Sequence, residues 1–246
     1  GVNAVPAFPS GVQNIGIGED DLSNLTGASN NIAIGKGSLA GALTTHPTHS
    51  DNIAIGQQAG ANLVGDDNVL IGTVAGGVMT TASQNVGIGN YVFQGSLAAN
   101  PVTGDRNTVM GQNGFFSVEN GADNVGMGFN SMIFLVNGNQ NTAIGTQAME
   151  NLTGSNNTAL GFRAGDNLTT GSSNITIGHD INAPVATASN QLTIGNGANT
   201  IIGGDIAGQS LDFPGYGGGT LTGTATFILG VDATGNVIEE PLPTGG

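Results

Sequence analysis

A five-residue pattern recurs along the chain: asparagine, an apolar or β-branched residue, a mostly small residue, a large aliphatic residue and glycine. The first copy is Asn14-Ile15-Gly16-Ile17-Gly18, and the eleventh, Gln191-Leu192-Thr193-Ile194-Gly195, begins with glutamine. A truncated echo follows at residues 199–203. Successive repeat glycines lie 17, 21, 16, 17, 22, 17, 17, 16, 17 and 17 residues apart, which predicts a solenoid with one turn per copy. These glycines are Gly18, Gly35, Gly56, Gly72, Gly89, Gly111, Gly128, Gly145, Gly161, Gly178 and Gly195.

The large and small positions of each copy are expected on opposite faces of a strand. Side chains alternate along a strand, so the second and fourth positions share one face and the third takes the other. Small residues suit the interior of a thin coil, which predicts that the fourth position points outward. The opposite assignment, with the large residues inside, would permit a monomer. The fourth-position residues are Ile17, Ile34, Ile55, Ile71, Ile88, Met110, Met127, Ile144, Leu160, Ile177 and Ile194.

Each unit is expected to contain two short strands and a polar turn, illustrated by residues 142–144, 147–149 and 151–156. The predicted fold is therefore an all-β, parallel β-solenoid with two short strands in each 16–17-residue turn. The repeat asparagine fits either a ladder of stacked side-chain amides or a corner that tolerates positive φ. The repeat glycine fits a corner with positive φ.

An outward ladder of large aliphatic residues has a consequence for assembly. Eleven stacked turns would expose more contiguous apolar surface than a monomer normally tolerates. We therefore expect this surface to be buried against identical chains in a homo-oligomer.

The chain divides into four parts by composition. Residues 1–13 are a lead-in, 14–207 the repeat domain, 208–222 a glycine-rich linker, and 223–246 a hairpin or a connection to a further domain. The first residues show neither Met nor a signal peptide, which favours a processed chain or a fragment of a longer protein.

Composition and charge exclude several classes of function. The net charge is −14 with only three Lys and Arg residues, which argues against nucleic-acid binding and against an anionic membrane surface. There is no Cys for disulfides or thiolate chemistry, and no apolar run long enough to span a membrane. No cofactor is expected.

Residues 141–149 and 157–161 resemble the head repeats of trimeric autotransporter adhesins (YadA-like heads) and, more closely, the related repeats of phage tail fibres. The resemblance covers about residues 14–203. It implies a left-handed β-roll packed as a homotrimer, although the longer period leaves room for a larger ring. Residues 229–238 resemble segments of large Bacteroidota surface proteins.

Four groups of residues are candidate sites. His46 and His49 form a His-x-x-His pair in one long interval, where an exposed loop is favoured over a metal site. Asn100 and Pro101 lie in the other long interval, and both loops are candidate contact sites. The third group is the turn acids, for which solvated turns are favoured over Ca²⁺ sites: Asp20, Asp21, Asp66, Asp67 and Asp123. The fourth group is a set of aromatic residues, for which core filling is favoured over an adhesive patch: Phe93, Phe115, Phe116, Phe129 and Phe134.

The sequence therefore predicts a non-enzymatic, structural or adhesive segment of an extracellular fibre or surface adhesin. Its partners would be copies of itself and a host or prey cell surface, through a glycan or matrix protein. The alternative is a glycan-binding segment of a phage tail fibre, located on the virion tail. An ice-binding solenoid is a weaker alternative, suggested by Thr142, Thr158, Thr176 and Thr193.

Overall fold

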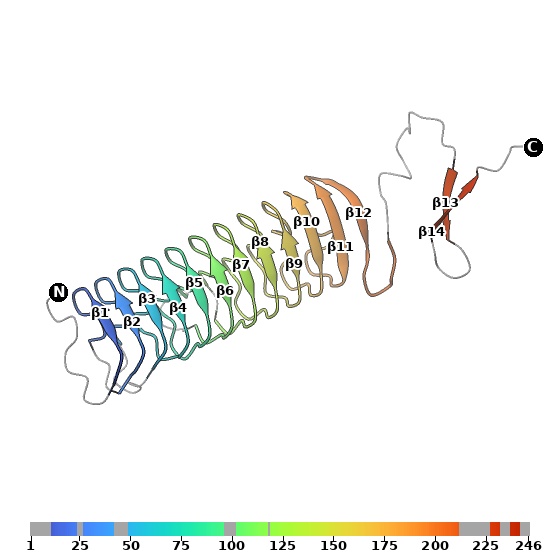
Figure 1. Ribbon diagram of the computed structural model, residues 1–246. Helices are drawn as coiled ribbons and strands as arrows, with labels where there is room; N and C mark the ends of the chain where they lie inside the picture. The colour runs from blue at the N-terminus through green and yellow to red at the C-terminus, as the bar shows by residue number, and fades with distance from the viewer. Residues whose placement is uncertain are drawn as a thin grey trace, which may run out of the picture.

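The computed structural model describes residues 11–23, 27–41, 49–95, 102–117 and 119–211, together with strands β13 (Phe227–Val231) and β14 (Val237–Pro241). These residues are all-β and contain no helix. Twelve strands stack into one sheet, forming a β-solenoid of about 10 turns (Figure 1). The predicted parallel solenoid is confirmed.

Each turn contributes one strand to this sheet, and the neighbours from β1 to β11 pair in parallel. Equivalent repeat positions face each other, as in Ala143 opposite Ala159 and Ile144 opposite Leu160. The strands are β1 (Ile15–Ile17), β2 (Ile32–Ile34), β3 (Ile53–Ile55), β4 (Val69–Ile71), β5 (Val86–Ile88), β6 (Thr108–Met110), β7 (Val125–Met127), β8 (Thr142–Ile144), β9 (Thr158–Leu160), β10 (Ile175–His179), β11 (Gln191–Asn196) and β12 (Asn199–Asp205).

The third repeat position lies inside the coil. Ala143 and Ala159 are fully buried, whereas their fourth-position neighbours Ile144 and Leu160 are 37% and 46% exposed. The same alternation runs from β2 to β9. The large aliphatic residues therefore point outward, and the opposite assignment is wrong.

Large and small residues interlock across the thin core. Phe115 packs where Gly126 occupies the third position, and a Cβ on Gly126 would lie 2.6 Å from the Phe115 ring. The third position carries Leu70 where Gly76 lies opposite, and there too a Cβ would come within 2.6 Å of the leucine. Leu70 is thus compensated by a glycine in its own turn and Phe115 by a glycine in the next turn, as dense core packing requires.

The prediction of two strands per turn is wrong, because the segment after the repeat glycine is not extended. Gln147 and Met149 both have positive φ, 58° and 48°, so the backbone coils instead of pleating. It is still hydrogen-bonded between turns: Gln147 N donates to Phe129 O at 2.9 Å, and Met149 N donates to Ala164 O at 3.1 Å. Alternate N–H groups therefore point to the preceding and the following turn.

The C-terminal end of the stack is closed by a reversal of chain direction. Strand β12 pairs with β11 antiparallel, with a register irregularity at Ile194/Gly195. The echo at residues 199–203 is therefore a capping strand and not a twelfth parallel turn. β13 and β14 also pair antiparallel, as the expected hairpin requires, while its turn at residues 232–236 lies outside the described residues.

Candidate functional site

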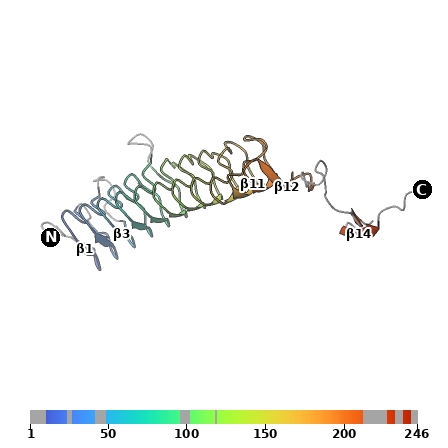
Figure 2. The ribbon, with the colours of Figure 1, turned by 90° about the horizontal axis from the view of Figure 1, so that it is seen from above.

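The outward side chains of β1–β11 form one continuous surface, which we call the strand face. It consists of two columns, the second and fourth repeat positions, stacked turn on turn by the parallel register. Figure 2 shows the strands gathered along one side of the rod. The strand face is therefore long, narrow and nearly flat.

The fourth-position column is apolar along its whole length. Its members are partly exposed in every turn: Ile17 is 59% exposed and Met127 is 36% exposed, whereas residues such as Ile34 and Ile177 are half-buried. The second-position column is apolar from Ile15 to Val86 and carries threonine at Thr108, Thr142 and Thr158. Burying such a surface is favourable by about 25 cal/mol per Å².

A ladder of asparagine side chains holds the strand face in register. Asn124 Oδ1 accepts two hydrogen bonds from Asn141, from the backbone N at 2.8 Å and from Nδ2 at 3.1 Å. Asn124 Nδ2 in turn donates to Asn107 Oδ1 at 3.0 Å and to Gly138 O at 2.9 Å. The same contacts between side chains join every turn from Asn14 to Asn174, and the predicted amide ladder is confirmed.

Positive φ falls on the residue before each repeat asparagine, not on the asparagine itself. Gln140 and Asn156, for example, have φ of 57° and 60°. The repeat glycines from Gly18 to Gly178 also have positive φ, as predicted, with 140° at Gly145. A Cβ on Gly145 would lie 2.2 Å from Gly161 O in the next turn. The close stacking of turns at this corner therefore requires glycine.

Gln191 ends the amide ladder. Its Nε2 donates to Asn174 Oδ1 at 3.3 Å, as an asparagine would. Its longer side chain then returns to its own turn, where Oε1 accepts from Val185 N at 2.8 Å and Nε2 donates to Val185 O at 2.8 Å. Gln191 Oε1, the atom that would accept hydrogen bonds from a following turn, is therefore already occupied.

A second polar ladder, not predicted from the sequence, lies two residues before the repeat asparagine. Here a side-chain oxygen accepts the backbone N–H of the equivalent residue one turn earlier, as Asp66 does from Ser50 at 2.7 Å and Ser172 does from Ser155 at 3.1 Å. Nine of these side-chain contacts run between Val12 and Ser189. The signal was available as a recurrent Ser, Asp or Asn at one position.

The threonines do not form an ice-binding array. Thr142 and Thr158 point outward from the second position, but Thr176 and Thr193 occupy the third position and are fully buried. A single flat threonine ladder therefore does not exist among these four residues.

The predicted contact loops are only partly described. His49 is 3% exposed, so its side chain is not displayed on an exposed loop and is a poor candidate for contact. His46, Asn100 and Pro101 lie outside the described residues. Among the residues that the structure describes, no group of three His, Cys, Asp or Glu side chains could hold a metal ion, and no helix is long and apolar enough to cross a membrane.

The acidic turns have structural partners. Asp123 forms an exposed ion pair with Arg106, from Oδ1 to Nε at 2.6 Å, and the guanidinium lowers the pKa of this carboxyl. Asp21 is fully buried and accepts hydrogen bonds from Ser38 N and Oγ at 3.2 and 3.0 Å. Burial raises the Asp21 pKa, although the Ser38 hydrogen bonds oppose this shift.

The aromatic residues divide between core and surface. Phe93 and Phe115 are buried and meet edge to face at 5.8 Å, which confirms core filling for this pair. Phe129 and Phe134 are each 45% exposed and do not fill the core. Phe116 is half-buried. All of these residues are phenylalanine, so the residue type alone does not tell which are buried and which are exposed.

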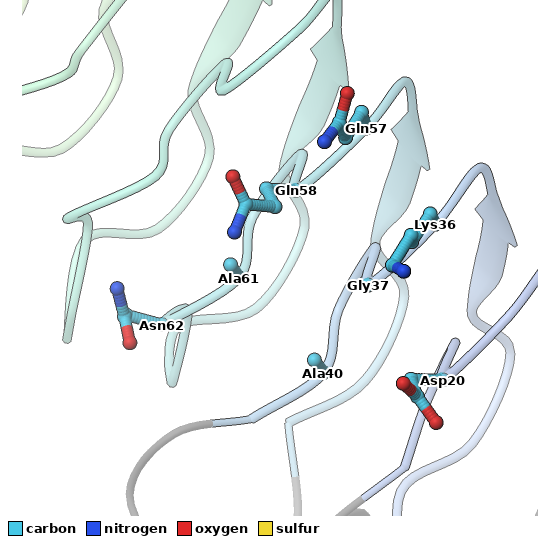
Figure 3. A pocket seen from close by; sticks show the side chains of 8 residues that line it. All are labelled: Asp20, Lys36, Gly37, Ala40, Gln57, Gln58, Ala61 and Asn62. Atoms are coloured by element: carbon cyan, nitrogen blue, oxygen red, sulfur yellow. The ribbon is translucent and has the colours of Figure 1, made fainter.

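Two open grooves lie beside the strand face. The N-terminal groove is lined by the small residues Ala40 and Ala61 and by polar residues that include Asp20, Lys36 and Gln58 (Figure 3). Lys36 Nζ is paired with Glu19 at 3.0 Å. The C-terminal groove lies next to the capping strand, and Arg163 and Asp180 contribute to its lining.

Comparisons with known proteins identify no relative. No family model, no curated protein and no solved structure matches this chain.

Proposed function

We propose that this chain is a structural and adhesive segment of an extracellular fibre, in which identical chains pack together through their strand faces. The observation that carries this proposal is the uninterrupted apolar column at the fourth repeat position, partly exposed in every turn from Ile17 to Ile194. A surface of this length favours association, because scattered single apolar residues are normal on a monomer but a contiguous stripe is not.

The second copy is the occupant that best matches the strand face. In the parallel register, equivalent residues repeat at every turn, so two identical faces present the same spacing to each other along the rod. Strand spacing of about 4.8 Å gives eleven strands a length of about 50 Å. We propose a trimer, as the resemblance to adhesin heads implies, with a larger ring as the alternative.

The proposed role in attachment follows from this rigid rod. Successive turns are joined by backbone hydrogen bonds, by the hydrogen bonds of the asparagine ladder and by those of the second polar ladder, so the rod is a stiff support. Surface groups repeated on several copies of the rod would bind a cell surface by avidity, even if each contact is weak. A host or prey cell, a bacterial surface or a virion tail would all suit such a segment, and we propose no catalytic activity.

The native mass of the full chain tests this proposal. Sedimentation equilibrium should give an integral multiple of the 24.3 kDa chain mass, and a trimer would give three copies. Small-angle scattering should give a particle no longer than a single chain, because the rods would lie side by side. A monomer at micromolar concentration would overturn the strand-face assembly. Attachment of fluorescent protein to intact cells tests adhesion separately.

A further inference from the structure

The C-terminal groove has the size of a small-molecule site. It encloses about 550 Å³ and lies where the last parallel turns meet the capping strand β12. Binding pockets commonly enclose about 300–1,000 Å³ and combine apolar lining with a few polar groups. Asn182, Pro184 and Thr200 contribute to this lining.

One wall of the groove is fixed by hydrogen bonds to the preceding turn. Asn167 holds Ala183 from both sides, with Nδ2 donating to Ala183 O at 2.8 Å and Oδ1 accepting from Ala183 N at 3.1 Å. Asp180 N donates to Phe162 O at 2.7 Å. Asn182 and Pro184 therefore project from an anchored segment, and a ligand would pay little to order it.

The charged groups of the groove are also held in place. Arg163 pairs with Asp166 through Nη2 at 2.7 Å and with Asp180 through Nη1 at 3.0 Å. Its positive charge is thus balanced by two carboxylates, which leaves no excess positive charge for an anionic ligand. The remaining N–H groups of the guanidinium and the carboxylate oxygens of Asp180 can still bind hydroxyl groups.

Asn182 adds an available amide. It is exposed, and its side chain makes no hydrogen bond with the part of the chain that the structure describes. An amide offers two donors and a carbonyl acceptor, a set that matches neighbouring hydroxyl groups on one ligand.

An aromatic surface adjoins these polar groups along the chain. Phe162 precedes Arg163 and His179 precedes Asp180, and the two rings stack with centroids 5.1 Å apart and an angle of 23°. Phe162 remains 41% exposed. Two stacked rings, each one residue before a residue that lines the groove, suit a ligand that has an apolar face and a polar edge.

We infer that the C-terminal groove and the Phe162–His179 stack form a binding site for a neutral oligosaccharide. A pyranose ring has an apolar C–H face for the aromatic stack and hydroxyl groups for Asn182, Arg163 and Asp180. The balanced arginine and the net charge of −14 disfavour sialylated or sulfated sugars. This inference rests on the proposed adhesive function, for which it supplies a ligand class.

The test measures binding of the full chain to an array of neutral gluco-, manno-, galacto- and N-acetylglucosamine oligosaccharides, with sialylated and sulfated sugars on the same array. We expect binding to at least one neutral sugar and little change between low and high salt, because ion pairing contributes little. Titration calorimetry with that sugar should show that Phe162→Ala and Asn182→Ala each weaken binding at least about tenfold, which corresponds to 1.4 kcal/mol.

Phe129→Ala is the matched control, because Phe129 occupies the same repeat position as Phe162, is 45% exposed and lies two turns away from the groove turn. It should leave sugar affinity unchanged. Binding of only anionic sugars, equal losses in the Phe129 and Phe162 variants, or no binding to any neutral sugar would overturn the inference. If wild-type protein attached to cells without binding neutral sugars, the proposed sugar site would be overturned but the adhesive function would stand. Absence of attachment would count against the adhesive function.

Discussion

Asn124 Oδ1 accepts both the backbone N–H and the side-chain Nδ2–H of Asn141, at 2.8 and 3.1 Å. One buried oxygen thus fixes the next turn by its main chain and its side chain together. Because the acceptor is inaccessible to water, losing it leaves donors that no solvent can satisfy. The amide ladder is therefore as important to the solenoid as its apolar core.

Asn124→Ala should lower the free energy of unfolding by about 3 kcal/mol, since Gly138 O and the donors of Asn141 lose their partner. Chemical denaturation measures the loss, and hydrogen exchange should become faster at the Asn141 amide. Asn182→Ala is the control for stability, because that side chain is exposed, and it should change stability by less than about 0.5 kcal/mol. Equal effects of the two variants would contradict the role of the ladder.

Gly145→Ala should destabilise the rod by more than about 3 kcal/mol, because the new Cβ would lie 2.2 Å from Gly161 O and φ is 140°. Gly197→Ala separates the two causes. Gly197 also has positive φ, 58°, but a Cβ there would meet nothing within 4 Å, so its cost should be about 1 kcal/mol. Thermal unfolding compares the variants, and similar melting temperatures would show that close stacking is unimportant.

Ile144→Asp and Ile177→Asp should dissociate the proposed assembly while each chain keeps its β-fold. Both residues belong to the outward column, so a carboxylate is tolerated in the monomer but costly in an apolar interface. Sedimentation gives the mass, and circular dichroism checks the fold. Asn151→Asp introduces the same charge on an exposed turn residue outside the strand face and should leave assembly intact. If the isoleucine variants remained fully assembled and equally resistant to heat, the strand face would not be the interface.

Val74→Asn should stabilise the protein by about 1 kcal/mol. Val74 has φ of 58°, a conformation that is unfavourable for a β-branched residue, whereas Asn113 and Asn130 occupy the equivalent position in later turns. Val185→Asn is the control, because Val185 is 53% exposed and does not have positive φ. A rise in melting temperature only for the Val74 variant is expected, and a fall would show that packing of Val74 outweighs its backbone strain.

Asp21→Asn should stabilise the fold at neutral pH. Burial raises the folded-state pKa of Asp21, and the nearby charge of Asp20 acts in the same direction, so ionisation penalises the native state. Below the unfolded pKa of about 3.9 both states are protonated, and the variant and wild type should be similar. As pH rises through the folded pKa, wild type should lose stability relative to the variant. Denaturation between pH 3 and 8 should show this widening gap, and a constant difference would refute it.

Some features followed from local sequence because each turn repeats the same constraint. The glycine spacing predicted the solenoid, the small third position predicted which residues face inward, and the recurrent asparagine pointed to an amide ladder or a corner, of which the ladder is observed. These patterns are strong because a residue such as Ala143 or Asn141 has an equivalent in nearly every turn, so each constraint appears about eleven times.

Other features arose only from contacts between turns. Gln147 and Met149 share no side-chain feature that would predict positive φ. Hydrogen bonds to both neighbouring turns impose that conformation. The echo at residues 199–203 resembles another repeat, yet it runs antiparallel. Gln191 ends the ladder because its longer side chain returns to Val185.

By itself, the sequence determined the period of the solenoid, its glycine corners and the alternation of inward and outward residues, since these depend on side-chain size and backbone freedom within one turn. Only the tertiary structure decided that the second segment coils, which aromatics are buried, that His49 is inside and that the last strand reverses. Those outcomes depend on what each turn meets in its neighbours, and the linear pattern does not contain that information.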